Sequence, residues 1–275
     1  MSMKQLLFFP FILAIILLGS CSDYSKVLKA DDYGRKFDMA NDLYENNPTK
    51  ASRIRSIGLY EQIYQRMPKQ GEGEVAYFRI GKAYYENKDF YMAGYYLGVF
   101  PQRFPFSPKA EEALFLSAMC SVNNSPEFSL DQMETKVAIN NLQQFANRYP
   151  NSPLVDSCNN IIDGLHFKLE SKSYEAVLLY SKTENYRAAV SSSDVFLEDY
   201  PMSVFKEEIY YTHVKNSFFL AKNSIESKKM ERTEEAIERY SNFVASFPES
   251  SYVDELARNN DGMIEYKAEL ERLAK

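Results

Sequence analysis

The 275 residues include 32 Lys and Arg against 38 Asp and Glu, which gives a formal net charge of −6. Because the basic residues are interleaved with acids and form no patch, the sequence argues against nucleic-acid binding. The length suits one elongated solenoid or two small domains.

Residues 1–20 have the features of an export signal. Lys4 supplies a charged head, and the run from Leu6 to Leu18 is almost wholly apolar but too short for a comfortable membrane span. It leads into Leu18-Gly19-Ser20-Cys21, which resembles the lipobox of bacterial lipoproteins. The resemblance implies cleavage before Cys21 and a covalent lipid on that residue. The alternative is an uncleaved anchor with an incidental cysteine.

Ser22, not Asp, follows this lipid site. By the sorting rule familiar from enterobacteria, this favours the outer membrane, with the mature chain facing the periplasm. Residues 21–35 are predicted to be a lipidated polar tether, of which Tyr24, Val27 and Leu28 could dock on the first repeat. Helical periodicity begins near Phe37, and a further helix is predicted over about 50–67.

The stretch from Glu74 to Ser107 predicts a pair of helices. Tyr77, Ile80, Gly81 and Tyr84 share one face of the first helix, and the second helix presents Ala93, Leu97 and Phe100 before Pro105. Gly81 and Ala93 are small where two helices cross closely. These residue types at these spacings resemble the tetratricopeptide repeat.

The same pattern recurs when the chain is aligned on its helix-ending prolines: Pro105, Pro150, Pro201 and Pro248. Twelve residues before each proline is an alanine: Ala93, Ala138, Ala189 and Ala236. Five before it is a phenylalanine: Phe100, Phe145, Phe196 and Phe243. Two after it is a serine, predicted to cap the next helix: Ser107, Ser152, Ser203 and Ser250. Pro108 and Pro153 would then occupy first helical positions. A weaker copy ends at Pro68 and has Ser56 where alanine is expected.

The alignment predicts an all-α, right-handed superhelical solenoid of about five tetratricopeptide-like helix pairs with a C-terminal capping helix. We expect N-terminal repeats over 36–152, and C-terminal repeats with the capping helix over 153–275.

Residues that could support catalysis or metal binding are few. His166 and His213 have no cysteine or acid at ligand spacing and are interpreted as ordinary helix residues. Cys120 and Cys158 could pack as small buried groups or form a disulfide, and the sequence leaves their state open. There is no glycine-rich phosphate loop, nucleophile elbow or catalytic carboxylate pair. We therefore expect a non-enzymatic binding protein without a metal or a cofactor.

The repeat geometry predicts where such a protein binds. With Tyr77 and its neighbours inside, the first helix of the pair turns Phe78, Lys82, Tyr85 and Glu86 toward the concave face, where solenoids receive peptides. The alternative is that these residues only cover the neighbouring pair.

A family resemblance becomes specific after Pro105. Its elements are Glu111-Glu112-Ala113, Ala118, Cys120, Ser125-Pro126, Leu130-Asp131-Gln132, Thr135, Ala138-Ile139 and Arg148-Tyr149-Pro150-Asn151-Ser152. They resemble the BamD (YfiO) lipoproteins of the β-barrel assembly machinery, and the likeness covers about residues 21–205. It implies an outer-membrane scaffold that helps fold and insert β-barrel proteins. It also implies a barrel partner with POTRA domains, held mainly by the C-terminal repeats, and unfolded barrel clients received by the N-terminal repeats.

Two other functions remain open. One is a glycan-capturing surface lipoprotein of the SusD type, against which stand the shorter chain and the absence of Trp. The other is a periplasmic repeat scaffold in division or peptidoglycan work. The sequence does not identify the residues that contact a barrel partner.

Overall fold

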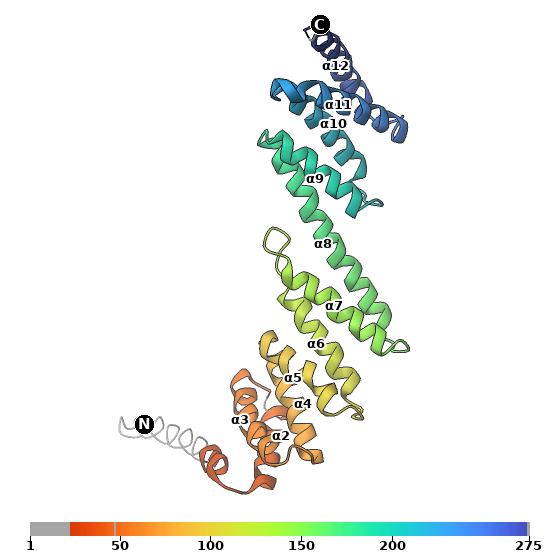
Figure 1. Cartoon of the computed structure of the whole chain (residues 1–275). Helices are drawn as coiled ribbons and strands as arrows, with labels where there is room; N and C mark the ends of the chain where they lie inside the picture. Colours follow the sequence, from red (N-terminus) through yellow and green to blue (C-terminus); the bar gives the residue numbers. More distant parts are fainter. Residues whose placement is uncertain (1–22, 47, 274–275) are drawn as a thin grey trace, which may run out of the picture. The chain divides into compact units, whose positions relative to one another are not determined.

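The computed structural model describes residues 23–46 and 48–273, and these ranges are all-helical apart from their connections. Consecutive helices pack against one another from α2 (Tyr33–Glu45) to α7 (Met133–Arg148) and from α9 (Tyr186–Asp199) to α12 (Val253–Leu273), as labelled in Figure 1. By their contacts they form two compact units, one reaching to Ile162 and the other beginning at Asp163, with 128–130 assigned to the second. The predicted boundary between 152 and 153 falls just before the long helix α8 (Val155–Lys182), whereas the contacts divide the chain inside that helix.

The helices of the first unit form consecutive pairs. Their bounds are α2 Tyr33–Glu45 with α3 Lys50–Arg66, α4 Gly71–Glu86 with α5 Phe90–Arg103, and α6 Ala110–Asn124 with α7 Met133–Arg148. In the second unit, the later part of α8 precedes α9 Tyr186–Asp199, α10 Lys206–Lys222, α11 Glu226–Ser246 and α12 Val253–Leu273. The predicted helix pairs and the final capping helix are therefore confirmed within the described residues.

Each pair ends in the same way at its proline. The residue before the proline leaves the helical conformation, and its N–H donates to a carbonyl four residues earlier. Its φ/ψ values are −129°/53° at Met67, −129°/65° at Phe104, −127°/63° at Tyr149, −127°/61° at Tyr200 and −136°/62° at Phe247. The proline ring disfavours helical geometry in the preceding residue, so the sequence ends each helix at a defined place.

Aromatic contacts accompany these helix ends. The phenylalanine five before the proline is fully buried, and its ring centroid lies 5.1–5.6 Å from that of the aromatic residue just before the proline. The pairs are Phe100–Phe104, Phe145–Tyr149, Phe196–Tyr200 and Phe243–Phe247. The four repeat alanines are also completely buried.

The serines after the prolines do not cap the helices directly. Each side-chain oxygen accepts from the N–H two residues on, for example Lys109 N to Ser107 Oγ at 3.0 Å and Phe205 N to Ser203 Oγ at 2.9 Å. The helices begin three residues after the serines, at Ala110 and Lys206. The predicted N-cap positions, and the first-helical positions of Pro108 and Pro153, were therefore wrong. The serines stabilise a preceding turn.

The described part of the predicted tether is folded. Residues 23–29 are helical, and Val27 is 1% exposed in a cluster with Tyr24 and Leu28. The Tyr24 hydroxyl donates to the Arg55 carbonyl at 3.1 Å. The docking expected for these side chains is present, and the described part of the tether is largely helical, with α2 beginning at Tyr33.

Gly81 lies at a close contact between α4 and α5. A Cβ at this position would lie 2.7 Å from Leu97 Cγ and 3.2 Å from Tyr96 Cβ, so the absent side chain permits the crossing. We predict that Gly81→Ala lowers the free energy of unfolding by about 1–3 kcal/mol, because an overpacked core must shift. Urea unfolding followed by circular dichroism measures this change.

Gly71→Ala in the same helix is the control, since a Cβ there meets no atom within 4 Å. It should leave stability unchanged or slightly raised. Equal losses in the two variants would contradict the close-crossing explanation.

Candidate functional site

The predicted concave groove begins with Phe78 and Lys82 on α4. Phe78 is only 7% exposed and packs edge-on against Phe100, with ring centroids 5.3 Å apart. Two lysine ammonium groups lie over its ring: Lys82 Nζ is 5.8 Å and Lys109 Nζ is 5.6 Å from the ring centroid. The expectation that Phe78 presents an exposed ring was therefore wrong, since the start of α6 packs over it.

Lys82 is engaged in an ion pair with that helix. Its Nζ lies 3.1 Å from Glu112 Oε1, and Lys109 Nζ lies 3.0 Å from Glu112 Oε2. Burial alone would raise the pKa of the Glu112 carboxyl, but hydrogen bonds from the two lysines hold it below its usual value. Lys82 thus helps to join consecutive helix pairs.

The other two predicted residues lie in different surroundings. The half-buried Tyr85 ring contacts Phe90 edge-on, with centroids 5.6 Å apart. Glu86 Oε1 accepts a hydrogen bond from the Tyr44 hydroxyl at 2.7 Å, and Glu86 Oε2 lies 3.8 Å from Arg53. Burial, strengthened by the contact with Glu86, raises the pKa of Tyr44. Glu86 therefore joins α4 to the preceding pair, and the four residues do not line one open groove.

The predicted packing residues of α4 lie inside. Tyr77 is 3% exposed, and Ile80 is fully buried. Gly81 meets α5 as described above, and the half-buried Tyr84 ring stacks on Tyr96 with centroids 5.8 Å apart. This face directs α4 against its neighbours, as the sequence predicted.

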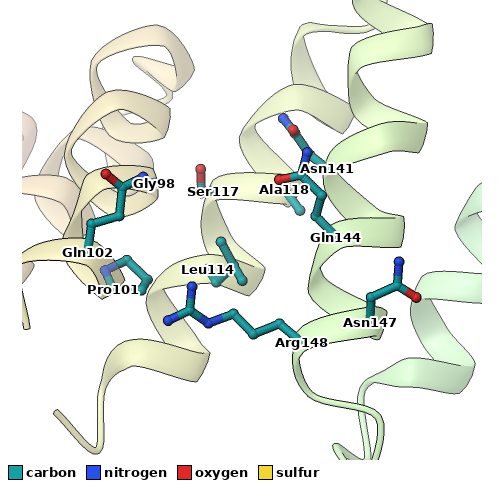
Figure 2. Close-up of a pocket in the computed structure, with 10 residues that line it drawn as sticks. All are labelled: Gly98, Pro101, Gln102, Leu114, Ser117, Ala118, Asn141, Gln144, Asn147 and Arg148. Carbon is teal, nitrogen blue, oxygen red and sulfur yellow. The ribbon is translucent and has the colours of Figure 1, made fainter. Parts of the chain in front are cut away.

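A recess of about 600 Å³ opens between α5, α6 and α7 of the first unit (Figure 2). The α5 side contributes Gly98, Pro101 and Gln102, and α6 contributes Leu114, Ser117 and Ala118. The α7 side contributes a row of long polar side chains, namely Asn141, Gln144, Asn147 and Arg148. In Figure 2 the Arg148 side chain extends from α7 beneath Leu114 toward Pro101.

Amide groups dominate the polar lining of this recess. An Asn or Gln side chain offers both N–H donors and a carbonyl acceptor, as a peptide group does. Four amide side chains line the recess. That of Asn141 already makes one hydrogen bond, from its Nδ2 to Ser121 Oγ at 2.8 Å. The side chains of Gln102, Gln144 and Asn147 are exposed. Such a lining can pair with an extended backbone of any sequence, and Arg148 favours an anionic group beside it.

The α5 backbone contributes to the same recess. Pro101 lies inside the helix and has no N–H to give to the Leu97 carbonyl, one turn earlier. Gly98 allows α6 to approach, because a Cβ there would lie 2.9 Å from Ser117 Oγ. The sequence did not predict this recess. Asn141, Gln144 and Asn147 are spaced three residues apart on α7, and this pattern is also typical of a helix face exposed to solvent.

The residues considered for metal or redox chemistry are dispersed. His213 is buried with its Nε2 3.0 Å from Asp194 Oδ1, and His166 is exposed on α8. Cys120 and Cys158 are buried free thiols, and burial raises the pKa of Cys120 to about 12. Within the described ranges, no group of three or more His, Cys, Asp or Glu could hold a metal ion.

The Glu112 ion pairs lead to a pH-dependent prediction. A carboxyl whose pKa is lower in the folded state stabilises the protein above its unfolded pKa, and that contribution disappears as the pH falls through the folded pKa. We therefore expect Glu112→Gln to lower the free energy of unfolding at pH 7, with a smaller difference from the native protein at about pH 3, below the ordinary glutamate pKa. Urea unfolding at the two pH values tests this.

Glu111→Gln removes the same charge from the same turn of α6 and serves as the control. If it reproduced the pH-dependent loss, general charge would explain the effect and the lysine pairs would not.

The predicted lipid site, Cys21, lies outside the described residues. None of the helices that the structure describes combines the length and the apolar character that crossing a bilayer requires.

Comparison with known proteins identifies the family. The YfiO family, described as outer membrane lipoprotein, matches residues 41–193 and 168–271, which together reach from α2 to α12. A search of curated proteins found no match. The matched ranges cover most of the chain, and they confirm the likeness of its repeat motifs to BamD (YfiO) proteins. The chain belongs to the YfiO family of outer membrane lipoproteins.

Proposed function

We propose that the protein is a non-enzymatic scaffold of the β-barrel assembly machinery, which assists the folding and insertion of outer membrane β-barrel proteins. The observation that carries this proposal is the family match, which extends over the helix pairs of both units. The repeats supply what such a role needs, namely stacked helices with recesses between them.

The mechanism would be recruitment, with no covalent step. In the family resemblance, the C-terminal repeats hold the POTRA domains of a barrel partner, and the N-terminal repeats receive unfolded clients. We place client binding on the first unit. Lys82, Tyr85 and Glu86 are separate surface candidates for client contact, with Phe78 as the buried support beneath Lys82. The amide-lined recess is a second surface there that suits an extended client backbone.

We also propose that a lipid on Cys21 holds the protein at the outer membrane, facing the periplasm. Two or three acyl chains bind a bilayer far more firmly than one. The family match favours this reading over a SusD-like glycan-binding lipoprotein or a scaffold in envelope division.

The assembly role predicts the partners that crosslinking recovers. Crosslinking of the tagged, lipidated protein in cells, followed by affinity capture and mass spectrometry, should yield a POTRA-containing barrel protein in near-stoichiometric amount, together with barrel clients. Capture of a TonB-dependent transporter with bound glycan, and no POTRA protein, would favour the SusD-like function instead.

A variant at two of these candidate residues separates the two kinds of partner. The double substitution Lys82→Ala and Tyr85→Ala should reduce the recovered clients several-fold and leave the POTRA protein unchanged. Unfolding curves establish that the variant is folded. Undiminished client recovery from a folded variant would remove Lys82 and Tyr85 from the client site.

Lipidation is tested by Cys21→Ser. We expect this variant to lose incorporation of labelled palmitate and to move from the membrane fraction to the soluble fraction or to remain as an uncleaved precursor. Cys120→Ser is the matched control, because Cys120 is buried in the first unit, and it should keep both the label and the membrane location. Label retained by Cys21→Ser would contradict the assignment.

A further inference from the structure

Three recesses of the protein occupy equivalent positions in the repeat. Each is lined by four residues at fixed distances from one helix-ending proline. Two of them lie seven and four residues before that proline, and two lie nine and twelve residues after it. The first set is Glu61, Tyr64, Tyr77 and Ile80; the second is Gly98, Pro101, Leu114 and Ser117; the third is Asp194, Leu197, Tyr210 and His213. The residue nine before the next proline completes each recess, namely Tyr96, Asn141 and Arg239.

The three recesses share a backbone and differ in chemistry. The recess between α5, α6 and α7 is lined by amides, and that between α9, α10 and α11 is lined largely by charged side chains. The recess between α3, α4 and α5, of about 320 Å³, is lined by Tyr64, Tyr77, Tyr95 and Tyr96, with Glu61 and Arg103 beside them. We call it the tyrosine recess.

The four rings of the tyrosine recess form a continuous row. The centroids of Tyr64 and Tyr77 lie 4.6 Å apart, those of Tyr77 and Tyr96 lie 5.2 Å apart, and those of Tyr95 and Tyr96 lie 5.4 Å apart. Tyr95 is 58% exposed, whereas Tyr77 is 3% exposed at the base. A row of aromatic rings that is open on one side provides an apolar platform with hydroxyl groups at its edges.

The hydroxyl groups of this row are not all used within the protein. The Tyr64 hydroxyl accepts from Arg103 Nη1 at 2.6 Å, and the Tyr96 hydroxyl donates to Glu61 Oε1 at 3.3 Å. The Arg103 guanidinium reaches the buried Tyr77 hydroxyl as a donor, but no described residue accepts that hydroxyl's own proton. Arg103 is exposed and lies over the Tyr77 ring, 5.2 Å from its centroid, so a ligand could displace its side chain.

A buried hydroxyl whose proton has no acceptor is costly, and such groups are rare in folded proteins. An incoming carbonyl oxygen would accept that proton. Burial raises the pKa of Tyr77, although the charge of Arg103 and a hydrogen bond from it oppose this, so the group is a neutral donor at physiological pH. The ligand therefore has to bring an acceptor to the base of an aromatic platform.

We propose that the tyrosine recess binds a proline-rich segment of a partner protein in the polyproline II conformation. Such a segment has no internal hydrogen bonds, so its carbonyls need external donors, and proline supplies no competing N–H. Its ridges pack on aromatic side chains, and its preformed conformation lowers the entropy lost on binding. Tyr77 donates to one carbonyl, and the ring row receives the proline rings.

The neighbouring amide-lined recess would extend this site. It lies one repeat further along the first unit and shares α5 with the tyrosine recess. Its exposed Gln102, Gln144 and Asn147 amides can donate to further carbonyls of the same segment. This inference goes beyond the assembly role, because its ligand is a proline-rich segment and not a barrel client. It can therefore be tested on the purified chain without a barrel partner.

The test measures the binding of a fluorescein-labelled oligoproline peptide to the full-length, lipidated protein in detergent, by fluorescence anisotropy. Tyr77→Phe removes only a hydroxyl whose proton has no acceptor and which contacts the exposed Arg103, so it should change the free energy of unfolding in urea little. We expect it to weaken oligoproline binding roughly five- to tenfold, as the loss of one hydrogen bond predicts.

Tyr210→Phe is the matched control, because Tyr210 occupies the equivalent position of the charged recess, and it should leave binding unchanged. A glycine–serine peptide of equal length should bind much more weakly than oligoproline, and so should oligoglutamate. No measurable oligoproline binding, equal binding by Tyr77→Phe, or equal binding of either comparison peptide would overturn the proposal. Preference for oligoglutamate would indicate an anion site at Arg103.

Discussion

The contact on which the repeats depend is that between a buried phenylalanine and the aromatic residue that precedes a helix-ending proline. The proline requires the preceding residue to leave the helix, and the ring contact fixes that residue against the core. The backbone angles at Phe104, Tyr149, Tyr200 and Phe247 agree within about ten degrees. Each following helix therefore starts from the same geometry, whatever side chains it presents outward.

This constant backbone explains why recesses recur at fixed offsets from the prolines. A solenoid whose pairs end alike places equivalent residues at equivalent points between helices. Selection can then change the lining without changing the fold. Tyrosines line one recess, amides the next, and Asp194, His213, Glu235 and Arg239 a third. Function in this protein is therefore a property of the lining residues, and the fold alone does not determine it.

The sequence predicted the architecture well, because prolines, alanines and phenylalanines act locally or across one helix crossing. It predicted surfaces poorly. Phe78 was expected on an open face, yet its exposure depends on α6, which follows a proline and a turn and packs over it. The recesses each require three helices from two pairs, so periodicity within one helix cannot identify them. The likeness to a known family indicated the role, and it did not indicate these sites.

The tyrosine recess contains a buried polar group whose hydrogen-bonding capacity the rest of the fold does not satisfy. Almost every buried polar group near it is used: the hydroxyl of the neighbouring Tyr60 bonds to both Asn41 and Arg79. The Tyr77 hydroxyl is also buried, and it has Arg103 as a donor beside it but no acceptor for its own proton. A phenylalanine would fill the same space at lower cost. Since natural sequences usually depart from internal consistency where a function requires it, a hydroxyl kept at the base of an open aromatic platform is best explained by a ligand that accepts its proton.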